Sequence, residues 1–575
     1  MTEQAPGWTV GKIGVVGAGI VGVPMAALLA ETGVRVGTDR PAPVVLVQRP
    51  SATSGWKVAA VNAGRSPIGG IEPGLDAILR SAVAAGRLSA TADPAALADA
   101  DAILVCVQTD RKGMGPDYGP LGEAVDALAA ALARRPAGNP PLVVFESTLA
   151  PTSMSTWVTD RFAAFGLRDG REILLAHSPN RVMPGRLVAR IRTSDKIAGG
   201  LNPEAGRRIR ALYAPLLAGG RLHLTNALSA EIVKTLENAA RDVRIAFSAE
   251  VARWCDARDV DFGRVRRDVN GRLAAEAGIP EGAEATLGLL TPTIGVGGHC
   301  LPKDGILLLW RALESGRIGA ESLFLEARRI NDEAPAEAAV RLAGLFGPLP
   351  GRTAALMGTA YRPNSEDTRN SPTLALGRIL ADAGCRVVLH DPYVRPGDAN
   401  LARSGLAGGF TRDAAEAVRR ADLVVFCQAH DAYVDLAAGL LRDRAAERTL
   451  FDGCRLAPET ERPGDAAAMP GVGRGRRAPD PALLDFVLRS YRAMETGLAN
   501  ETAALVDILN AACVRGADGR AAFATIRELA ATCVTGCRIV DPAPVTDLPV
   551  FDGFAFRLAA RARAAAIRSE RGVRP

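Results

Sequence analysis

Cys300 has the clearest nucleophilic setting of any residue in this chain. It ends the run Gly295-Val-Gly-Gly-His-Cys300 and is followed by Leu-Pro-Lys303-Asp304. A glycine-rich turn that leads into a helix places a cysteine at the positive end of the helix dipole, which stabilises the reactive thiolate. Asp304 follows about one helical turn later, so it can face Cys300. The pattern predicts a catalytic nucleophile in preference to a buried structural cysteine.

A lysine and an asparagine lie four residues apart in the run Ala230-Glu-Ile-Val-Lys234-Thr-Leu-Glu-Asn238, which places both on one face of a helix. Lys234 can stabilise an alkoxide that develops on a substrate, and Asn238 can orient a water or a sugar oxygen. Only six of the 69 basic residues are lysines, so a retained lysine is mildly favoured where a compact ammonium is needed. A solvated surface pair is the alternative interpretation, and the spacing alone does not reject it.

A second motif, Gly17-Ala-Gly-Ile-Val-Gly22, follows an apolar strand expected over 12–16 and opens a helix expected over 20–31. In a dinucleotide-binding turn the first glycine makes the bend, the second lets backbone approach a pyrophosphate, and the third allows close helix packing. The context therefore predicts a dinucleotide site formed by Gly17, Gly19, Val21 and Gly22.

The end of the next strand bears on the choice of cofactor. An acidic residue commonly holds the adenosine ribose there. The strand expected over 44–47 ends instead in Gln48 and Arg49, whereas Asp39 would take the place if the strand lay at 34–37. Because an arginine can pair with a 2′-phosphate, NADP stays open, and NAD is the favoured prediction.

These motifs need a scaffold of alternating strands and helices. Further strands are expected at 103–107 and 142–146, and the alternation predicts a parallel, doubly wound sheet. Helical periodicity covers about 229–269, stops at a glycine- and proline-rich loop over 291–302, and resumes to about residue 332.

A second α/β region is expected from about residue 353, with strands at 354–357 and 386–390 around a helix at 373–383. The segments that begin at Asp101 and Asp422 echo each other, as two related nucleotide-binding halves would. The overall prediction is an α/β protein with two Rossmann-like doubly wound domains joined by a central helical segment, plus a helical C-terminal extension. The expected boundaries are 10–225 (dinucleotide-binding domain), 226–340 (central helices), 350–458 (second α/β domain), 459–481 (linker) and 482–575 (extension).

The C-terminal extension is expected to be peripheral. Every motif lies before about Gly464, so removal of the later residues is expected to leave the chemistry largely intact. The arginine-rich tail from Arg557 to Pro575 is interpreted as a solvated or frayed helix.

Composition excludes several classes of protein. A net charge of +6 over 575 residues is too small to argue for nucleic acid and suits anionic ligands. No apolar run is long enough to span a membrane, and residues 1–8 do not resemble a signal peptide. The nine scattered cysteines indicate reduced cytoplasmic thiols. Cys533 and Cys537 are interpreted as a buried pair, and no metal site is predicted.

Taken in order, the motifs closely resemble the UDP-glucose/GDP-mannose dehydrogenase family over roughly residues 10–456. The segments that carry the resemblance are Glu146-Ser-Thr148, Ser178-Pro-Asn-Arg-Val-Met-Pro-Gly185, Lys234 with Asn238, Gly297-Gly-His-Cys300 through Asp304, Tyr361-Arg-Pro-Asn-Ser-Glu-Asp-Thr-Arg369-Asn-Ser-Pro372 and His390-Asp-Pro-Tyr393.

The resemblance implies an NAD domain over 10–225, a central helical dimerisation segment over 226–340 and a UDP-sugar domain over 350–458. It implies a homodimer that oxidises a UDP-sugar alcohol to a carboxylate with two NAD, through a thiohemiacetal and a thioester on Cys300. It implies that Lys234 and Asp304 handle the oxyanion and the water, and that Asn238 and Thr148 position sugar and water. It further implies cofactor contacts from Gln48, Arg49, Thr109, Thr148, Lys303 and Arg369, and substrate contacts from Asn180, Arg181, Lys234, Asn238, Gly297 and Arg362.

Two positions depart from the family pattern. Asn180 stands where the family usually has a glutamate that helps to hold the hydrolytic water, and an amide cannot take a proton. Arg362 replaces a family lysine and keeps its charge. The Val-Met-Pro-Gly ending after Arg181 resembles members that act on UDP-N-acetylhexosamines, especially UDP-N-acetylmannosamine.

Other functions remain as alternatives. The chain could be a UDP-glucose or GDP-mannose 6-dehydrogenase, a two-electron β-hydroxyacid dehydrogenase, or a non-catalytic nucleotide-sugar scaffold. Cys300 and the second nucleotide-binding region disfavour the two-electron enzyme.

Overall fold

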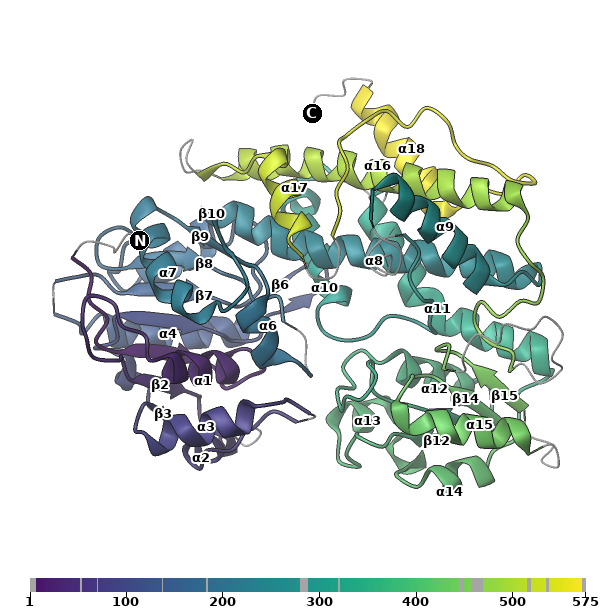
Figure 1. Cartoon of the computed structure of the whole chain (residues 1–575), viewed down its shortest axis with the longest axis horizontal. Helices are drawn as coiled ribbons and strands as arrows, with labels where there is room; N and C mark the ends of the chain where they lie inside the picture. Colours follow the sequence, from purple (N-terminus) through teal and green to yellow (C-terminus); the bar gives the residue numbers. More distant parts are fainter. Residues whose placement is uncertain are drawn as a thin grey trace. The chain divides into compact units, whose positions relative to one another are not determined.

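The computed structural model describes residues 7–51, 54–69, 71–136, 138–182, 185–279, 288–318, 321–443, 449–456, 469–513, 519–533 and 537–570, with side chains to residue 563 in the last helix. The chain forms two compact units (Figure 1). Unit 1 comprises 1–237, 306–317 and 502–538, and unit 2 comprises 238–305, 318–501 and 539–575. The chain therefore passes from one unit to the other several times along its sequence.

Unit 1 is built on an eight-stranded sheet in the order β10-β9-β8-β7-β4-β1-β2-β3, in which only the β8–β9 pair is antiparallel. Its strands are β1 (Ile13–Val16), β2 (Val44–Val47), β3 (Leu88–Thr91), β4 (Ala102–Val105), β7 (Leu142–Phe145), β8 (Leu174–His177), β9 (Lys196–Gly200) and β10 (Leu222–Asn226). A short hairpin, β5 (Asp110–Lys112) and β6 (Gly115–Asp117), stands apart. Strands β1, β2, β4 and β7 are continuous apolar runs because helices cover both faces of the sheet.

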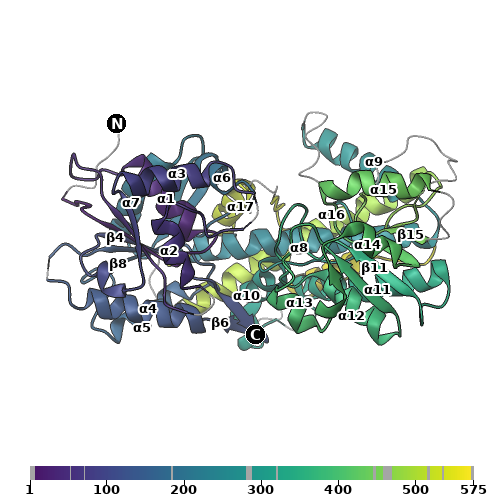
Figure 2. The ribbon, with the colours of Figure 1, turned by 90° about the horizontal axis from the view of Figure 1, so that it is seen from below.

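Two apolar cores flank this sheet. The helices α1 (Gly22–Thr32), α3 (Leu75–Ala84), α6 (Leu187–Thr193) and α7 (Pro203–Tyr213) pack on one face. The helices α4 (Gly119–Leu132) and α5 (Thr159–Ala163) pack on the other (Figure 2). The helix α2 (Trp56–Asn62) lies beside β3.

Unit 2 contains a five-stranded parallel sheet in the order β13-β12-β11-β14-β15. Its strands are β11 (Thr353–Met357), β12 (Arg386–His390), β13 (Phe410–Thr411), β14 (Leu423–Phe426) and β15 (Thr449–Asp452). The helices α11 (Leu323–Phe346), α12 (Pro372–Asp382) and α13 (Ala399–Ser404) cover one face, and α14 (Ala414–Arg419) and α15 (Val434–Arg442) cover the other.

Long helices make up the rest of the protein. They are α8 (Ala227–Ala257), α9 (Phe262–Glu276), α10 (Leu301–Glu314), α16 (Pro481–Ala512), α17 (Phe523–Ala531) and α18 (Arg557–Glu570). Among the described helices, none combines the length and apolar composition that crossing a membrane requires.

The α/β prediction is confirmed, including a second strand at 44–47, and the alternative strand at 34–37 is wrong. The helical stretch expected over 229–269 is two helices, broken where Asp259 adopts a φ of 56°. The helix expected to reach residue 332 is also two helices, α10 and α11, and the second continues through Pro335 to Phe346.

The C-terminal residues differ from the peripheral extension expected from the sequence. Residues 482–575 form no separate unit but are divided between both units. Much of the expected linker at 459–481 lies outside the described residues. Its last part belongs to unit 2, where Gly471 forms a β-bridge with Asp452 and Arg474 forms one with Asp261. The tail helix α18 is packed at its start, because Leu558 and Ala562 are buried. The structure therefore argues against a dispensable C-terminal region.

Candidate functional site

The loop between β1 and α1 has the geometry expected of a dinucleotide turn. Gly17 has a φ of 102°, and a Cβ there would lie 2.7 Å from the Cys106 carbonyl oxygen. A Cβ on Gly22 would lie 1.9 Å from the Gly17 oxygen, whereas a Cβ on Gly19 would meet nothing within 4 Å. Val21 precedes the helix and gives its first N–H groups no side-chain cap. The open position at Gly19 and the uncapped helix end together fit an incoming pyrophosphate.

Two side chains shape this loop from beside it. The Gln48 side-chain oxygen accepts a hydrogen bond from the Ala18 N–H at 2.8 Å, and Lys57 Nζ donates to the Ala18 oxygen at 3.1 Å. Arg49 forms an ion pair with Glu123 on the surface. Asp39 is exposed and does not follow β2. The sequence analysis missed Lys57, although the scarcity of lysine was a usable signal.

The carboxyl ends of β4 and β7 bring two predicted residues together. Thr109 is buried, and its hydroxyl donates to the Thr148 carbonyl oxygen at 2.7 Å. Ser147 donates to the Val107 oxygen at 2.6 Å, so the two strand ends are joined by side-chain bonds. In a parallel sheet of this type, ligands bind beside the carboxyl ends of the strands.

Glu146, beside Thr148, is held inside the protein. Its carboxylate accepts a bond from Lys196 Nζ at 2.9 Å and from the Tyr213 hydroxyl, and all three side chains are buried. A buried ion pair with complete partners is a structural element, so Glu146 supports the strand end. Lys196 is a second lysine that sequence reasoning did not use.

Asn180 and Arg181 follow β8 and differ in their bonding. The Asn180 side-chain nitrogen is buried and is without a hydrogen-bond partner among the described residues. Arg181 donates to Glu237 at 3.1 Å and to the Thr532 hydroxyl at 2.9 Å, so its guanidinium is engaged by the protein. Arg181 was expected to bind substrate, and the structure assigns it at least a structural ion pair.

Lys234 is buried on α8, so the interpretation as a solvated surface pair is wrong. Its positive charge acts on two buried neighbours in unit 1. Burial lowers the pKa of His177 to about 3, with Lys196 and Lys234 adding to the effect. Burial raises the pKa of Glu237, while Arg181 and Lys234 oppose that rise. Lys234 therefore lies inside the protein, where an ammonium that stabilises an oxyanion would have to lie.

In unit 2, Asp304 lies at the centre of a buried hydrogen-bonded trio. Its carboxylate accepts a bond from the Asn238 amide at 2.5 Å and another from Lys303 Nζ at 2.5 Å. Asp304 and Lys303 are almost completely buried. Lys303 was expected at the cofactor, and within the protein its ammonium is bonded to this carboxylate.

Cys300 directly precedes α10 and is exposed. Its carbonyl oxygen accepts bonds from the Asp304 N–H at 2.9 Å and the Lys303 N–H at 3.1 Å, which closes the first turn of the helix. Asp304 was expected to face Cys300 through its side chain. The recorded bond between them is through the backbone, and the carboxylate is held by Asn238 and Lys303.

The glycines before Cys300 let the loop rest on the segment after β11. A Cβ on Gly297 would lie 2.5 Å from Tyr361, and one on Gly298 would lie 2.7 Å from the same ring. The Gly298 N–H donates to the Arg369 oxygen at 2.8 Å, and its carbonyl oxygen accepts from the Asn370 side chain at 2.8 Å. Only glycine permits this approach, which ties the position of Cys300 to residues 361–370.

The two predicted arginines of this segment have different partners. Arg369 makes a two-pronged contact with Asp367, at 2.9 Å from Nε and 2.5 Å from its terminal nitrogen. Arg362 is half-buried and makes no recorded ion pair or hydrogen bond with the described residues. Arg362 is thus the better candidate for an anionic ligand.

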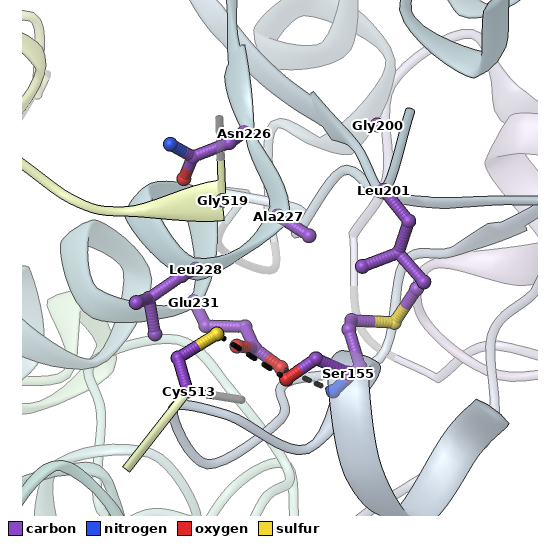
Figure 3. Close-up of a pocket in the computed structure, with 10 residues that line it drawn as sticks. Ser155, Gly200, Leu201, Asn226, Ala227, Leu228, Glu231, Cys513 and Gly519 are labelled. Atoms are coloured by element: carbon purple, nitrogen blue, oxygen red, sulfur yellow. Dashed lines mark hydrogen bonds between the residues drawn. The ribbon is translucent and has the colours of Figure 1, made fainter. Parts of the chain in front are cut away.

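A cavity of about 150 Å³ lies in unit 1 at the start of α8, with Glu231 in its wall (Figure 3). Glu231 accepts bonds from the Thr152 and Met154 N–H groups at 2.8 Å, and the Cys513 sulfur lies 3.6 Å from the Ser155 hydroxyl. Burial raises the pKa of Glu231 to about 8, against the opposing effect of its two backbone bonds. Sequence reasoning did not find this cavity because its walls come from distant segments. Across the described part of the chain, no cluster of side chains is arranged to hold a metal ion.

Comparisons with known proteins account for most of the chain. Residues 11–217 match the NAD binding domain of the UDP-glucose/GDP-mannose dehydrogenase family, 228–333 its central domain and 355–459 its UDP binding domain. A UDP-N-acetyl-D-mannosamine dehydrogenase from Pyrococcus horikoshii is 31% identical over 470 residues, which are 81% of this chain and 99% of that protein. An NDP-N-acetyl-D-galactosaminuronic acid dehydrogenase from Ralstonia nicotianae is 31% identical, over 77% of this chain and 97% of that protein.

Solved structures agree with the sequence comparisons. The UDP-D-ManNAc dehydrogenase of Pyrococcus horikoshii superimposes with a TM-score of 0.67 at 30% identity, over 81% of this chain and 100% of that one. The NDP-N-acetyl-D-galactosaminuronic acid dehydrogenase of Methanosarcina mazei Go1 gives a TM-score of 0.65 at 32% identity, over 81% of this chain and 96% of that one. With its dinucleotide turn, its cysteine at the head of α10 and these matches over all three domains, the chain belongs to the UDP-glucose/GDP-mannose dehydrogenase family and is an NAD-dependent nucleotide-sugar dehydrogenase.

Proposed function

We propose that this enzyme oxidises the C6 alcohol of a UDP-N-acetylhexosamine, such as UDP-N-acetylmannosamine, to a carboxylate. One alcohol, two NAD⁺ and one water are consumed, and one carboxylate, two NADH and three protons are formed. The observation that carries the proposal is the buried Asp304 carboxylate, held by Asn238 and Lys303 one helical turn after the exposed Cys300. NAD, when bound, accepts the hydride in each of the two oxidations.

Cys300 is assigned as the nucleophile. After the first oxidation gives an aldehyde, the Cys300 sulfur adds to the carbonyl carbon and forms a thiohemiacetal. Loss of a second hydride from that carbon leaves a thioester, and attack by water releases the carboxylate and restores the thiolate. The position before the first turn of α10 supports this role, because the helix dipole stabilises negative charge on sulfur.

Asp304 is assigned to the water. A carboxylate that accepts two short hydrogen bonds is held in one orientation, which suits a group that takes a proton from water. Such general-base help typically contributes about 10²–10⁴-fold. We assign Lys303 to positioning this carboxylate and Asn238 to positioning the carboxylate together with the sugar.

Lys234 is assigned to the oxyanion that develops at C6 in each oxidation, since it is a buried cation. Thr148 is assigned to positioning sugar and water, and Asn180, whose amide nitrogen is without a partner among the described residues, to the substrate. Because an amide cannot take a proton, Asn180 orients and does not act as a base.

The fit for NAD rests on the turn itself. The open face at Gly19 and the uncapped start of α1 suit a pyrophosphate, and the Gln48 amide stands where the adenosine ribose is expected. Arg49, the candidate partner for a 2′-phosphate, is already paired with Glu123, which favours NAD over NADP.

The choice of an N-acetylated sugar is supported by two kinds of observation. The proteins from Pyrococcus horikoshii and Ralstonia nicotianae are named for N-acetylated sugars. The half-buried Arg362, which makes no recorded ion pair or hydrogen bond with the described residues, is assigned to the anionic part of the nucleotide sugar. Arg369 and Arg181 are assigned to positioning, because Asp367 and Glu237 already engage them.

The test is the amount of NADH formed per sugar, measured with UDP-N-acetylmannosamine, UDP-glucose and GDP-mannose. We expect two NADH per UDP-N-acetylhexosamine consumed, with a far higher kcat/KM than for the other two sugars. One NADH per sugar would indicate a two-electron dehydrogenase, and none with any sugar would indicate a binding protein.

The Cys300→Ser variant sharpens this test. Serine is a much poorer nucleophile at neutral pH, so carboxylate formation should fall by at least about 10³-fold. Cys513→Ser changes a partly buried thiol that has no role in the proposed mechanism and should retain activity, which makes it the matched control. Carboxylate production by Cys300→Ser at the rate of the control would remove Cys300 from the mechanism.

A further inference from the structure

The residues after the UDP binding domain form helices that no family model covers, because the last match ends at residue 459. The Pyrococcus horikoshii relative is aligned over 99% of its length by 81% of this chain, so these helices are an addition. They are nevertheless packed: Phe486 contacts Trp254, and Tyr491 contacts Phe247, with ring centroids 6.5 and 5.8 Å apart. The first half of α16 is thus seated on the second half of α8, as Figure 1 shows.

The sequence of α16 can be laid on that of α8 at one constant spacing. Four residues are then identical: Arg241, Glu250, Ala252 and Asp256 of α8 fall opposite Arg492, Glu501, Ala503 and Asp507. With a small shift, the next helix also matches, since Phe262, Val265 and Arg266 of α9 fall opposite Phe523, Ile526 and Arg527 of α17. Four identities between two amphipathic helices do not establish a repeat by themselves. A repeat requires that the matched residues also make equivalent contacts.

The matched glutamates perform reciprocal tasks. Glu250 on α8 accepts bonds from the Arg557 N–H at 2.9 Å and the Leu558 N–H at 3.2 Å, and so caps α18. Glu501 on α16 accepts bonds from the Leu323 N–H at 2.8 Å and the Ser322 hydroxyl at 2.5 Å, and so caps α11. Each long helix therefore caps the helix that follows the other one, and both carboxylates are buried.

The remaining contacts complete an approximate two-fold arrangement within unit 2. The helices α11 and α18 pack against each other, and α8 packs against α16. Close approach is built in at Gly497, where a Cβ would lie 2.3 Å from the Ala562 Cβ on α18. A two-fold axis that exchanges α8 with α16 and α11 with α18 relates one glutamate cap to the other and maps the α8–α16 pair and the α11–α18 pair each onto itself. Reciprocal contact of this kind is the signature of an interface between two copies of one segment.

We propose that residues 481–570 are a diverged second copy of the central helical segment, folded onto the first copy as a partner subunit would be. The chain covers its own central helices and is a monomer, in place of the homodimer that the family resemblance implies. The second copy has Asp485 and Arg489 opposite Lys234 and Asn238, so it has kept the packing role and lost the catalytic side chains.

The second copy also reaches predicted substrate residues in unit 1. Thr532, at the end of α17, accepts a hydrogen bond from Arg181, and the Arg520 carbonyl oxygen accepts one from Asn226, which directly precedes α8. Because these contacts join the addition to the Arg181–Glu237 pair, the added helices support the proposed nucleotide-sugar site as well as the central helices.

The decisive measurement is the mass of the full-length enzyme by sedimentation velocity, over about two decades of concentration. We expect a single species of 60.0 kDa throughout. A species of twice that mass, stable on dilution, would overturn the proposal. The mass measurement does not depend on turnover. A failure of the proposed chemistry would therefore not affect this result, and a failure of this result would not affect the proposed chemistry.

Paired variants test the internal symmetry. Glu250→Ala and Glu501→Ala should lower Tm by similar amounts of several degrees, since each removes a buried cap of the same kind, whereas the exposed control Asp485→Ala should change Tm by about one degree or less. A large loss in one cap variant and none in the other would show that the caps are not equivalent and would contradict the repeat. If a variant does not fold, the mass of the unmodified protein still decides the question.

Discussion

The turn after the first strand is built in the same way in the two sheets, but the N–H groups of that turn have different partners. In unit 1, β1 is followed by Gly17, where a Cβ would meet the Cys106 backbone after the neighbouring strand. In unit 2, β11 is followed by Gly358, where a Cβ would meet Gln428 after the neighbouring strand. The residue after the next strand also faces the turn in both: Gln48 accepts one N–H, from Ala18.

The counterpart of Gln48 in unit 2 is Asp391, and it accepts far more. Its carboxylate receives the N–H groups of Thr359, Ala360, Tyr393 and Val394, at 2.7 to 3.1 Å, and lies 3.2 Å from His430. In unit 1 the helix starts at Gly22 and its first N–H groups are left for a ligand. In unit 2 the turn is bound to its own carboxylate, and α12 starts only at Pro372. One fold therefore provides an open dinucleotide turn in one unit and a self-satisfied turn in the other.

The largest effect that tests this comparison should come from Asp391→Ala. The change leaves four backbone N–H groups without their buried acceptor, and removal of a buried, fully bonded charge costs about 3–5 kcal/mol of unfolding free energy. Gln48→Ala, the matched change in unit 1, removes one accepted N–H and should cost about 1 kcal/mol. Urea unfolding of both variants measures the difference, and equal losses would mean that the two turns are built alike.

The Asp391 carboxylate should also change how the stability of the protein depends on pH in acid. Burial tends to raise the pKa of Asp391, but the hydrogen bonds from His430 and the backbone outweigh it and hold the pKa below its usual range. A depressed pKa in the folded state gives stability that is present above the unfolded value of 3.8 and is lost as the pH falls through the folded value. In Asp391→Ala this part of the acid destabilisation should be missing from unfolding curves recorded below pH 3.8.

A smaller and more selective effect is expected in the glycine turn of unit 1. Gly22→Ala puts a Cβ against the Gly17 oxygen and should cost about 1–3 kcal/mol of stability. Gly19→Ala meets no protein atom and should leave Tm unchanged while it raises the KM for NAD about tenfold or more, because the methyl group takes the space of the pyrophosphate. Loss of Tm in Gly19→Ala without a change in KM would place the cofactor elsewhere.

The smallest effect should come from making unit 1 resemble unit 2 at one residue. Gln48→Asp supplies a carboxylate that can accept ribose hydroxyls and repels a 2′-phosphate. The KM for NAD should stay within about threefold, while the KM for NADP should rise by more than about tenfold. Steady-state kinetics with both cofactors checks this, and an unchanged ratio would show that Gln48 does not face the ribose.

Sequence reasoning found the parts of the molecule that are set by local pattern. Strands such as 44–47 are continuous apolar runs between turns. Gly17 and Gly22 have the steric reasons expected of them, and Gly19 leaves an open face as expected for a pyrophosphate. The echo between Asp101 and Asp422 also has a structural basis, because each carboxylate accepts an N–H from the start of the neighbouring first strand, Gly11 or Thr353, at 2.7 Å.

What the sequence could not provide depends on contacts between distant segments. The bond between Asn238 and Asp304 joins α8 to α10 across 66 residues of sequence, so local pattern could not predict it. The interpretation of 482–575 as a peripheral extension failed because its helices show ordinary amphipathic periodicity, which does not say which surface they cover. The reciprocal bonds of Glu250 and Glu501 become visible only when four segments are seen together.

The two capping glutamates, Glu250 and Glu501, also retain protons in the folded protein at a pH where an ordinary glutamate has lost them. Burial raises the pKa of Glu250 to about 6 and that of Glu501 to about 7, from an ordinary value of 4.5. Their contribution to stability is therefore complete below pH 4.5 and is lost as the pH rises through 6 and 7, because the unfolded chain gives up protons that the folded chain retains. Unfolding between these limits should release protons, and calorimetry in buffers of different ionisation enthalpy would count them. A rise in pH through this range should therefore weaken the packing of the helices that the two glutamates cap.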